Sequence, residues 1–466
     1  MIVTIPENGL QDKVCQHLSL GLLQEVLPAS QIEELLETYQ MWEQRERQLN
    51  MVAMVYFLLG LHLYPHLSQR AVYAKLVSGL RTMRDDVPAA IPSKSAFSYR
   101  REQLGSDLLE ELFAQCAGPK ATEQTPGAFW KGMRLLALDG TLESVPDTPD
   151  NRATFRYSTD DELSHSPFPQ ARVVLLVECA TRLICAAEIS PCRQAEATST
   201  RVLLERGQWE NTLVLWDSGF HASRAIFQLR ACGGHVLGRV TSNTLLSPCY
   251  RLCDGSYLTY IYQDQDHHSG ERKLVRVISY TFTDPRIAGA GQQVYRLVTT
   301  LLDPFKYPAK ELAVLYHERW QVEVVIDESR THLRLSARTL RSLTANGVIQ
   351  ELYALLLAHT LLRTLMLRAA QPQGLAPTTI SFTDTIHLVD DSLVPLSLVS
   401  SARRQQMVVS LLQEIGTFRL PKQRVRMQAR VVKRVRSRYE RKKPEHGHAP
   451  PFELDLDFHQ ILALVV

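Results

Sequence analysis

Two carboxylates follow apolar segments that have the pattern of strands. Asp139 ends the apolar part of LLALDGT, and Asp217 ends that of LVLWDSG. A carboxylate placed directly after buried residues is costly unless it is solvated, paired or bound to a metal ion. Each residue taken alone is more simply explained as part of an Asp-Gly or Asp-Ser-Gly turn. Two such residues, at the ends of strands that a parallel α/β layer can set side by side, favour a functional site.

The predicted helix around Tyr316 carries a narrow polar face. At about 100° per residue, Tyr316, Arg319, Glu323 and Arg330 fall close together on this face. The apolar residues between them indicate that much of the helix is buried, so that the polar face needs a partner. Asp327 falls near the same face, and periodicity alone therefore leaves Glu323 and Asp327 open as a third acid.

Three carboxylates that converge on one pocket are the usual ligands of two Mg²⁺ ions. Hard divalent cations prefer oxygen ligands, and two ions about 4 Å apart can activate a hydroxyl nucleophile and stabilise the leaving oxygen of a phosphodiester. The adjacent Tyr316, Arg319 and Arg330 can hold phosphate oxygens. The pattern predicts phosphodiester chemistry with two Mg²⁺ ions as cofactors, or Mn²⁺ as a substitute.

The combined motifs resemble the signature of bacterial cut-and-paste DDE transposases, in the group named after insertion sequence four, with its Tyr-Arg-Glu-Lys motif. The matching segments are DGT at 139–141, PDTPDN at 146–151, DSGFHAS at 217–223, HERWQVE at 317–323 and Tyr316-x2-Arg319-x3-Glu323-x6-Arg330. The resemblance implies that Asp139, Asp217 and Glu323 are the catalytic acids and metal ligands, which selects Glu323 over Asp327. Arg330 stands where the family has Lys; the charge is kept, but the two side chains bind phosphate with different geometry.

The same resemblance implies a fold and an activity. We expect an α/β protein with a ribonuclease-H-like core that binds double-stranded DNA at the terminal inverted repeats of its own element. It would cleave the ends by metal-dependent hydrolysis and transfer the 3′-hydroxyl ends into target DNA, as a homodimer in a synaptic complex. Two other classes remain as alternatives: a catalytically inactive DNA-binding protein with a transposase fold, and a metal-dependent DNA nuclease without strand transfer.

The order of predicted elements divides the chain into five parts. Residues 1–125 form an N-terminal helical, DNA-binding domain, 126–241 the first part of the core, and 304–370 its second part with the catalytic helix. Residues 242–303 are expected to be an inserted β subdomain over the active site, because the 105 residues between the second and third acids exceed the roughly 30–40 that a strand, a helix and their loops need. Residues 371–466 form a C-terminal region with a basic DNA-contacting segment.

Apolar periodicity predicts the individual elements. The predicted strands are Arg134–Leu138, Arg172–Glu178, Arg182–Ile189, Leu213–Trp216, His235–Val240, Tyr257–Tyr262, Lys273–Phe282 and Val294–Leu301. The predicted helices are Ile32–Ala53, Ala71–Leu80, Ala195–Arg206, Ala222–Ala231, Ala309–Leu335 and Val348–Arg368, the last apolar nearly all round and therefore buried.

A short basic helix is expected after Pro92. Either Ser93 or Ser95 could cap it, and its basic residues face either a phosphate backbone or solvent. Those residues are Lys94, Arg100 and Arg101.

Positive charge is concentrated near the C-terminus. Twelve Lys and Arg residues and one Glu lie between Arg419 and Lys443, a local charge of +11 that leaves −8 for the rest of the chain. This density indicates a polyanionic partner, most often nucleic acid, with a solvated tail as the alternative. Five of these residues are expected to contact phosphates and could share a helix: Arg424, Arg426, Arg430, Lys433 and Arg434.

Composition favours a soluble globular chain of several domains. Of the 466 residues, 45% are hydrophobic and 22% charged, and the eight cysteines form no C-x-x-C pair. That pattern argues against a disulfide scaffold and a zinc ribbon. The N-terminus lacks a basic start followed by an apolar run, and polar residues interrupt the longest apolar stretch. We therefore expect a cytoplasmic, nucleoid-associated bacterial protein with no membrane partner.

Overall fold

The computed structural model forms two compact units, which are described separately. The first unit comprises Met1–Val214, Cys232–Gly234 and Arg319–Arg419, and the second Leu215–Ala231, His235–Glu318 and Leu420–Val466. The structure describes residues 18–421 except 19, 42–48, 82–90, 160–165, 208, 221, 264–270, 285–290 and 335–338, and beyond them residues 425–426, 430–431, 440–441, 453–454 and 462–464.

The N-terminal part of the first unit is helical, as the periodicity predicted. Its helices are a 3₁₀ turn at Gly21–Glu25, α1 (Ala29–Thr38), α2 (Met51–Leu63), α3 (Gln69–Arg81), α4 (Lys94–Leu104) and α5 (Asp107–Cys116). The single helix expected over Ile32–Ala53 is wrong, because α1 and α2 are separate. Gln40 takes a left-handed φ of 55° just after α1. Asn50 then caps α2 by accepting a hydrogen bond from the Ala53 amide at 2.7 Å.

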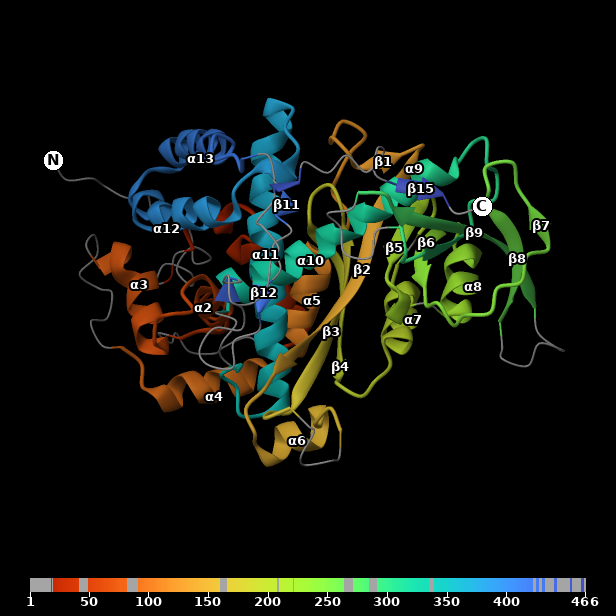
Figure 1. Ribbon diagram of the computed structural model, residues 1–466. Coiled ribbons are helices and arrows are strands. Elements are labelled where there is room, and N and C mark those ends of the chain that lie inside the picture. Colours follow the sequence, from red (N-terminus) through yellow and green to blue (C-terminus); the bar gives the residue numbers. More distant parts are fainter. Residues whose placement is uncertain are drawn as a thin grey trace. The chain divides into compact units, whose positions relative to one another are not determined.

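The longest helix, α11 (Ala345–Ala370), forms the centre of this helical part. It packs against α2, α5, α12 (Phe382–Leu398) and α13 (Ser401–Ile415), as Figure 1 shows. The prediction of a buried helix over Val348–Arg368 is confirmed. By length and composition α11 could cross a membrane, but 94% of its most apolar window is buried inside the protein, as expected of a core helix.

The first unit also holds the antiparallel half of the core. The strands are β1 (Phe129–Trp130), β2 (Met133–Ser144), β3 (Gln170–Glu178) and β4 (Leu183–Pro191), in the order β4-β3-β2 with β1 beside β2. The helices α6 (Pro149–Phe155) and α7 (Glu196–Glu205) belong to the same unit. The predicted strand end at Leu138 is wrong, because β2 continues through Asp139, which pairs with Leu175, to Ser144. An Asp-Gly pair therefore lies inside a strand here and not in a turn.

The strand β5 (Thr212–Trp216) begins in the first unit and ends in the second. The second unit continues with α8 (Ser223–Ala231) and β6 (His235–Val240). Three antiparallel strands followed by a strand, a helix and a further strand fit a ribonuclease-H-like core.

The alternating segments between residues 242 and 303 form strands, as predicted. They are β7 (Tyr250–Arg251), β8 (Tyr257–Tyr262), β9 (Arg272–Phe282) and β10 (Tyr295–Thr299). The expectation that they form a subdomain of their own needs correction, because β10 pairs with β6 and the order β6-β10-β9-β8-β7 extends one sheet. The insertion in the sequence is thus an extension of the sheet. A C-terminal strand, β15 (Leu462–Leu464), also pairs with β9.

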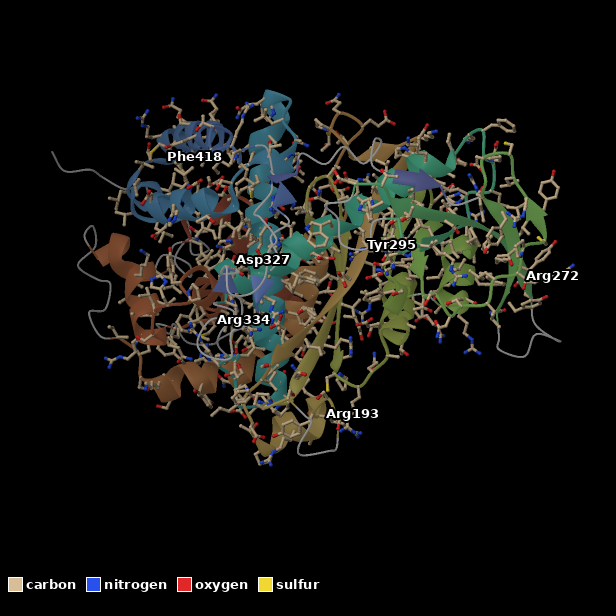
Figure 2. The ribbon with its side chains drawn as sticks, in the orientation of Figure 1. Arg193, Arg272, Tyr295, Asp327, Arg334 and Phe418 are labelled. Carbon is tan, nitrogen blue, oxygen red and sulfur yellow. The ribbon has the colours of Figure 1, made fainter. Side chains whose placement is uncertain are left out.

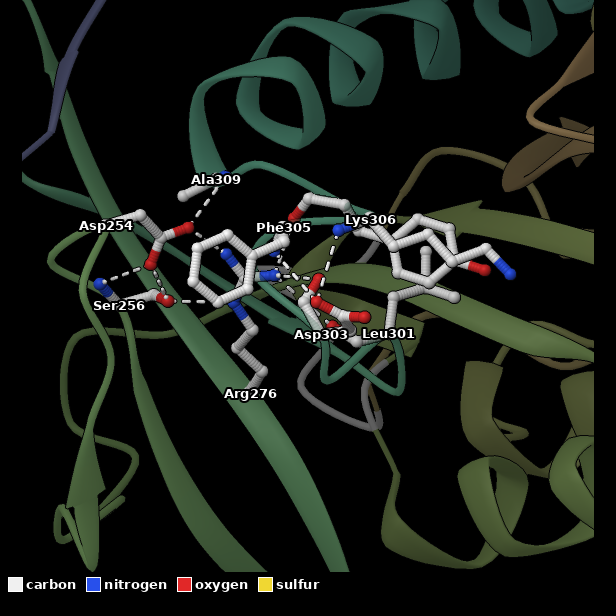
Figure 3. Close-up of polar contacts among 9 residues, drawn as sticks. Asp254, Ser256, Arg276, Leu301, Asp303, Phe305, Lys306 and Ala309 are labelled. Carbon is white, nitrogen blue, oxygen red and sulfur yellow. Dashed lines mark hydrogen bonds and ion pairs between the residues drawn. The ribbon is translucent and has the colours of Figure 1, made fainter.

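A fully buried arginine ties this sheet to the helix α9 (Ala309–Leu315). Arg276 of β9 donates to Ser256 Oγ at 2.8 Å and to the Tyr307 carbonyl at 2.6 Å, and it pairs with Asp254. Figure 3 shows Arg276 beside Ser256 and Asp254. The Asp254 carboxylate in turn accepts from the Ala309 amide at 3.0 Å. The helix α9 leads to Tyr316, and its first turn is therefore held by the ion pair of Arg276 with Asp254.

Only fragments of the basic C-terminal segment lie within the described residues. Arg424, Lys433 and Arg434 are outside them. Arg426 lies in β11 (Val425–Arg426), which pairs with β14 (Glu453–Leu454), and Arg430 lies in β12 (Arg430–Val431), which pairs with β13 (Glu440–Arg441). The idea that all five basic residues share one helix is therefore wrong for Arg426 and Arg430.

Candidate active site

The strand β2 presents three polar side chains at every second residue. Asp139, Thr141 and Glu143 alternate with Gly140 and Leu142, and alternation in a strand sets the three on one face. Asp139 Oδ1 accepts a hydrogen bond from the Gly140 amide at 2.8 Å. The second oxygen of this carboxylate faces a partner from another element.

That partner comes from the helical segment 316–332, which is not one regular helix. Its parts are a 3₁₀ turn at Tyr316–Arg319, the α-helix α10 (Trp320–Asp327) and a π-helical turn at Glu328–His332. The helical run predicted from Ala309 to about Leu335 is confirmed as far as His332, but the expectation of one regular α-helix is wrong. The angular positions calculated at about 100° per residue therefore hold only within α10. Turns of π type are rare in proteins, and those that occur are often found at functional sites.

Arg319 joins two of the predicted catalytic acids. Its Nη1 donates to Asp139 Oδ2 at 3.1 Å, and its Nη2 donates to Glu323 Oε1 at 2.6 Å. The Arg319 side chain is 12% exposed, against 20% for Asp139 and 31% for Glu323. The structure thus brings Asp139, Arg319 and Glu323 together in the first unit, whereas Asp327 is exposed and accepts from Thr331 Oγ1 at 2.8 Å.

Arg330 reaches the same face of β2 two residues further along. Its Nη1 donates to Thr141 Oγ1 at 3.2 Å, and its Nε lies 3.5 Å from Glu143 Oε1. Arg334 pairs with the other oxygen of the Glu143 carboxylate, which is nearly inaccessible to solvent. Figure 2 shows Asp327 and Arg334, which precede and follow the π-helical turn that carries Arg330. An ion pair of Arg330 with Asp327 or Glu328, the simple alternative to a phosphate contact, is not what the structure shows.

A buried charge cluster anchors the π-helical turn that follows α10. Glu328 pairs with Arg363 and accepts from His359 Nε2 at 3.0 Å, both on α11, and lies 3.5 Å from Arg182 Nη1. Arg182 also donates to Gln321 Oε1 at 2.9 Å. Burial by itself would raise the pKa of Glu328, but the charge of Arg363 and the contacts with His359 and Arg182 outweigh it and lower the pKa to about 2. Glu328 is therefore an ionised anchor that locates the segment bearing Glu323.

Asp217 lies in the second unit, at the end of β5 as predicted. Its Oδ1 accepts from the Ser218 amide at 2.7 Å and lies 3.8 Å from Arg239 Nη1 on β6. The Arg239 guanidinium in turn lies over the Tyr295 ring, 5.1 Å from its centre. The Asp217 side chain is 35% exposed, so the carboxylate is partly accessible to solvent.

Tyr316 also belongs to the second unit, in a cluster of aromatic rings. It is buried and lies edge-on to His317 at 6.2 Å, and His317 contacts Phe282 at 5.7 Å. Tyr280 and Tyr295 stack at 5.4 Å in the same cluster. The Tyr316 side chain thus packs in a cluster of aromatic rings and does not lie on a solvent-facing helix surface.

Two basic residues proposed for the N-terminal helix have structural roles. Ser93 caps α4, as one of the two predicted alternatives, by accepting from the Ala96 amide at 3.2 Å. Arg100 is buried and donates to the Leu49 carbonyl at 2.8 Å, and Arg101 donates to Gln350 at 2.9 Å and to Ser342 at 2.8 Å. Their guanidinium groups hold the helix in place, and only Lys94 of the three is exposed.

Sequence reasoning missed four polar residues of the first unit. Thr141 and Glu143 have a signal, the alternation D-x-T-x-E along β2, which the assumed strand end at Leu138 concealed. Glu328 and Arg334 have none, because their partners are distant in the sequence; Arg363, for example, is 35 residues from Glu328.

Comparisons with known proteins match most of the chain. Residues 17–114 match the family described as Insertion element 4 transposase N-terminal, and residues 130–361 match the family described as Transposase DDE domain. The class of protein is thus a transposase of the DDE type. The chain belongs to the insertion-element-4 family of DDE transposases.

Two relatives and one solved structure illustrate the similarity. Transposase InsG for insertion sequence element IS4 of Escherichia coli (strain K12) is 27% identical over 399 residues, 84% of this chain and 86% of that protein. Putative transposase InsZ of the same organism is 26% identical over 147 residues, 31% of this chain and 49% of that protein. The cryo-EM structure of piggyBac transposase synaptic complex with hairpin DNA has a TM-score of 0.46 at 10% identity, over 86% of each chain. A similarity of that size supports no argument about this chain.

The first unit supplies two carboxylates of the kind that bind a divalent cation. DDE transposase domains generally depend on such ions, and carboxylate oxygens are the ligands that Mg²⁺ and Mn²⁺ prefer. Asp139 and Glu323 supply those oxygens on either side of one guanidinium. Among the residues that the structure describes, no three His, Cys, Asp or Glu side chains are grouped closely enough to hold a metal ion.

Proposed function

We propose that this transposase cuts and pastes its own insertion sequence. It binds the terminal inverted repeats, hydrolyses the phosphodiester at each end and transfers the 3′-hydroxyl ends to target DNA. Asp139, Asp217 and Glu323 are the catalytic acids and the ligands of two Mg²⁺ ions, or of Mn²⁺ in their place. The observation that carries the proposal is the pairing of Asp139 and Glu323 around Arg319, from segments 180 residues apart in the sequence.

Each residue has a role in this proposal that follows from its chemistry. When bound, the metal ions activate the attacking hydroxyl and stabilise the leaving oxygen. The three carboxylates hold them, and Arg319 and Arg330 bind phosphate oxygens through charge-assisted hydrogen bonds. Tyr316 contributes one further hydroxyl donor to a phosphate.

The test uses purified full-length protein and linear DNA that carries both terminal repeats of the element. In Mg²⁺ we expect new 3′-hydroxyl ends at the repeats, followed by their joining to a supercoiled target plasmid; the control contains EDTA. Cleavage without joining under all conditions identifies the chain as a nuclease. Specific binding of the repeats without cleavage identifies it as an inactive DNA-binding protein.

The partners and location belong to the same proposal. The working assembly is a homodimer that holds two double-stranded DNA ends, because two ends must be joined together. It acts in the bacterial cytoplasm on nucleoid DNA. Residues 1–125 would form the DNA-binding domain, 126–241 and 304–370 the core, and 371–466 the basic region.

Arg330 is expected to position DNA. We expect Arg330→Ala to weaken end binding by about 1.5–3 kcal/mol, because one charge-assisted contact is lost. Arg330→Lys should recover most activity if charge alone matters, and little if the bidentate guanidinium is needed. Binding of labelled ends and their cleavage are measured at one salt concentration. The control is Arg403→Ala on α13, since Arg403 is exposed and donates to Gln406 Oε1 at 3.1 Å. Wild-type binding and cleavage by Arg330→Ala would rule out the phosphate role.

The basic C-terminal segment is expected to contact phosphates without reading the sequence. Replacing Arg424, Arg430, Lys433 and Arg434 by alanine should weaken the binding of end DNA and of random DNA alike. The slope of log affinity against log salt should flatten by about 0.9 for each lost phosphate contact. The slope is obtained from affinities measured between about 50 and 200 mM salt. A slope equal to that of the wild type would show that the segment faces solvent or another subunit.

A further inference from the structure

The guanidinium of Arg319 occupies the position of a cation between two catalytic carboxylates. It donates one hydrogen bond to Asp139 at 3.1 Å and one to Glu323 at 2.6 Å. Arg319 occupies one oxygen of each carboxylate, and the other oxygen of Asp139 accepts from the Gly140 amide. With 12% of its side chain exposed, Arg319 is more buried than either acid. The pair of acids is thus already neutralised in part by a group of the protein itself.

A divalent cation that used the same two oxygens would lie beside this guanidinium. Like charges a few ångströms apart repel each other strongly where water is partly excluded. Metal binding and the observed position of Arg319 are therefore competing states of the same two carboxylates. The Arg319 backbone lies in the regular α region at the start of α10, with φ −52° and ψ −30°.

We propose that Arg319 keeps the cation site between Asp139 and Glu323 closed in the DNA-free protein, and that a backbone phosphate of the DNA opens it by binding the guanidinium. This inference rests on the proposed function. Two oxygens of a phosphate can accept the pair of hydrogen bonds that the planar guanidinium fork donates. Transfer of Arg319 from the carboxylates to the phosphate removes the competing positive charge from both acids, so that the ion is bound tightly only where DNA is present.

Such an arrangement couples two ligands, and coupling is reciprocal. DNA raises the affinity for the cation by some factor, and the cation raises the affinity for DNA by the same factor. Couplings of this kind are typically about 5–150-fold. Removal of the Arg319 guanidinium should abolish the coupling, because no guanidinium then competes with the cation, whether or not DNA is bound.

The test measures Mn²⁺ affinity by the loss of free-ion EPR signal, for wild type and Arg319→Ala. The DNA is a duplex that already ends at the cleavage position, so that no bond is left to hydrolyse, and its own Mn²⁺ binding is subtracted. Without DNA, we expect Arg319→Ala to bind Mn²⁺ about tenfold more tightly than wild type. The duplex should raise the wild-type affinity at least about fivefold and the Arg319→Ala affinity less than twofold.

Two further variants keep the result unambiguous. Arg319→Lys carries a single ammonium that cannot bridge both acids as a planar fork does, and its DNA-free Mn²⁺ affinity should lie between those of wild type and Arg319→Ala. Glu323→Gln should bind Mn²⁺ more weakly than wild type with or without DNA.

A DNA-free Mn²⁺ affinity of Arg319→Ala equal to or below that of wild type, in a protein with an unchanged unfolding midpoint, overturns the inference. The proposed function survives that outcome if Glu323→Gln still weakens Mn²⁺ binding and end cleavage still needs Asp139. If Mn²⁺ binding depends on neither Asp139 nor Glu323, even with DNA, the proposed function fails as well.

Discussion

Replacing Glu328 by alanine should lower the free energy of unfolding by about 3–5 kcal/mol. The loss arises because the substitution leaves Arg363 and Arg182 as buried charges without their carboxylate, and removes the hydrogen bond to His359. Urea unfolding at pH 7, followed by tryptophan fluorescence, gives the value. The control is Glu205→Ala, an exposed residue of α7 whose replacement should change the stability by no more than about 0.5 kcal/mol.

The same carboxylate makes the stability depend on pH in a defined direction. The pKa of Glu328 falls from 4.5 to about 2 on folding, so the folded state binds fewer protons. Its stabilisation is complete above pH 4.5 or so and is lost as the pH falls toward about 2, a total of about 3 kcal/mol. Burial also lowers the pKa of His359 below 6.5, so a further loss begins as the pH falls below that value.

Glu328→Gln separates these two contributions. This variant has no carboxyl group at residue 328, and the fall in stability below about pH 4.5 should be smaller than in the wild type. Urea midpoints between neutral and acidic pH provide the comparison. A pH profile of Glu328→Gln equal to that of wild type would show that the acid sensitivity has another origin. A free energy of unfolding of Glu328→Ala within about 1 kcal/mol of wild type would refute the stabilising role of the buried charge cluster.

Asp139→Ala, Asp217→Ala and Glu323→Ala are each expected to abolish end cleavage. The three acids share the metal ions in the proposed mechanism, and loss of several kcal/mol of transition-state stabilisation lowers the rate by at least about a thousandfold. Binding of labelled ends should remain close to wild type, because phosphate contacts supply most of the affinity. Single-turnover cleavage in Mg²⁺, measured beside equilibrium binding, tests both statements.

Asp327→Ala is the matched control for Glu323. Both residues lie on α10 and periodicity alone does not choose between them, but Asp327 is exposed and contacts Thr331. The Asp327→Ala variant should cleave the ends at a rate near that of wild type. If Asp327→Ala is inactive and Glu323→Ala is active, the third acid has been assigned to the wrong residue; cleavage by Asp217→Ala at the wild-type rate would refute the triad.

Local patterns were enough to predict most elements of the fold. The apolar run of β5, the alternation in β8 and β9, and the length of α11 are all visible in residues close together in sequence. The arrangement of Asp139 in the middle of β2 was missed because Asp-Gly is typical of turns. Pairing with β3 over nine residues outweighs that preference.

The contacts of the site required the folded chain. The bridge from Asp139 to Arg319 spans 180 residues, and the pair of Glu328 with Arg182 spans 146. Such pairs leave no local pattern, because each partner alone reads as an ordinary charged surface residue. The resemblance to a family supplied the acids Asp139, Asp217 and Glu323, but it did not supply Glu143 or Glu328.

The position of the Glu328 partners in the gene affects how genomic copies should be interpreted. His359 and Arg363 are encoded after all three acid motifs, on the helix α11. A copy interrupted by a stop codon between the codons for Arg330 and Ala345 would keep each signature segment, yet its product would expose Glu328 without either partner from α11. Surveys that count the acid motifs alone would class such a copy as intact, whereas the reading frame through Arg363 is the better criterion.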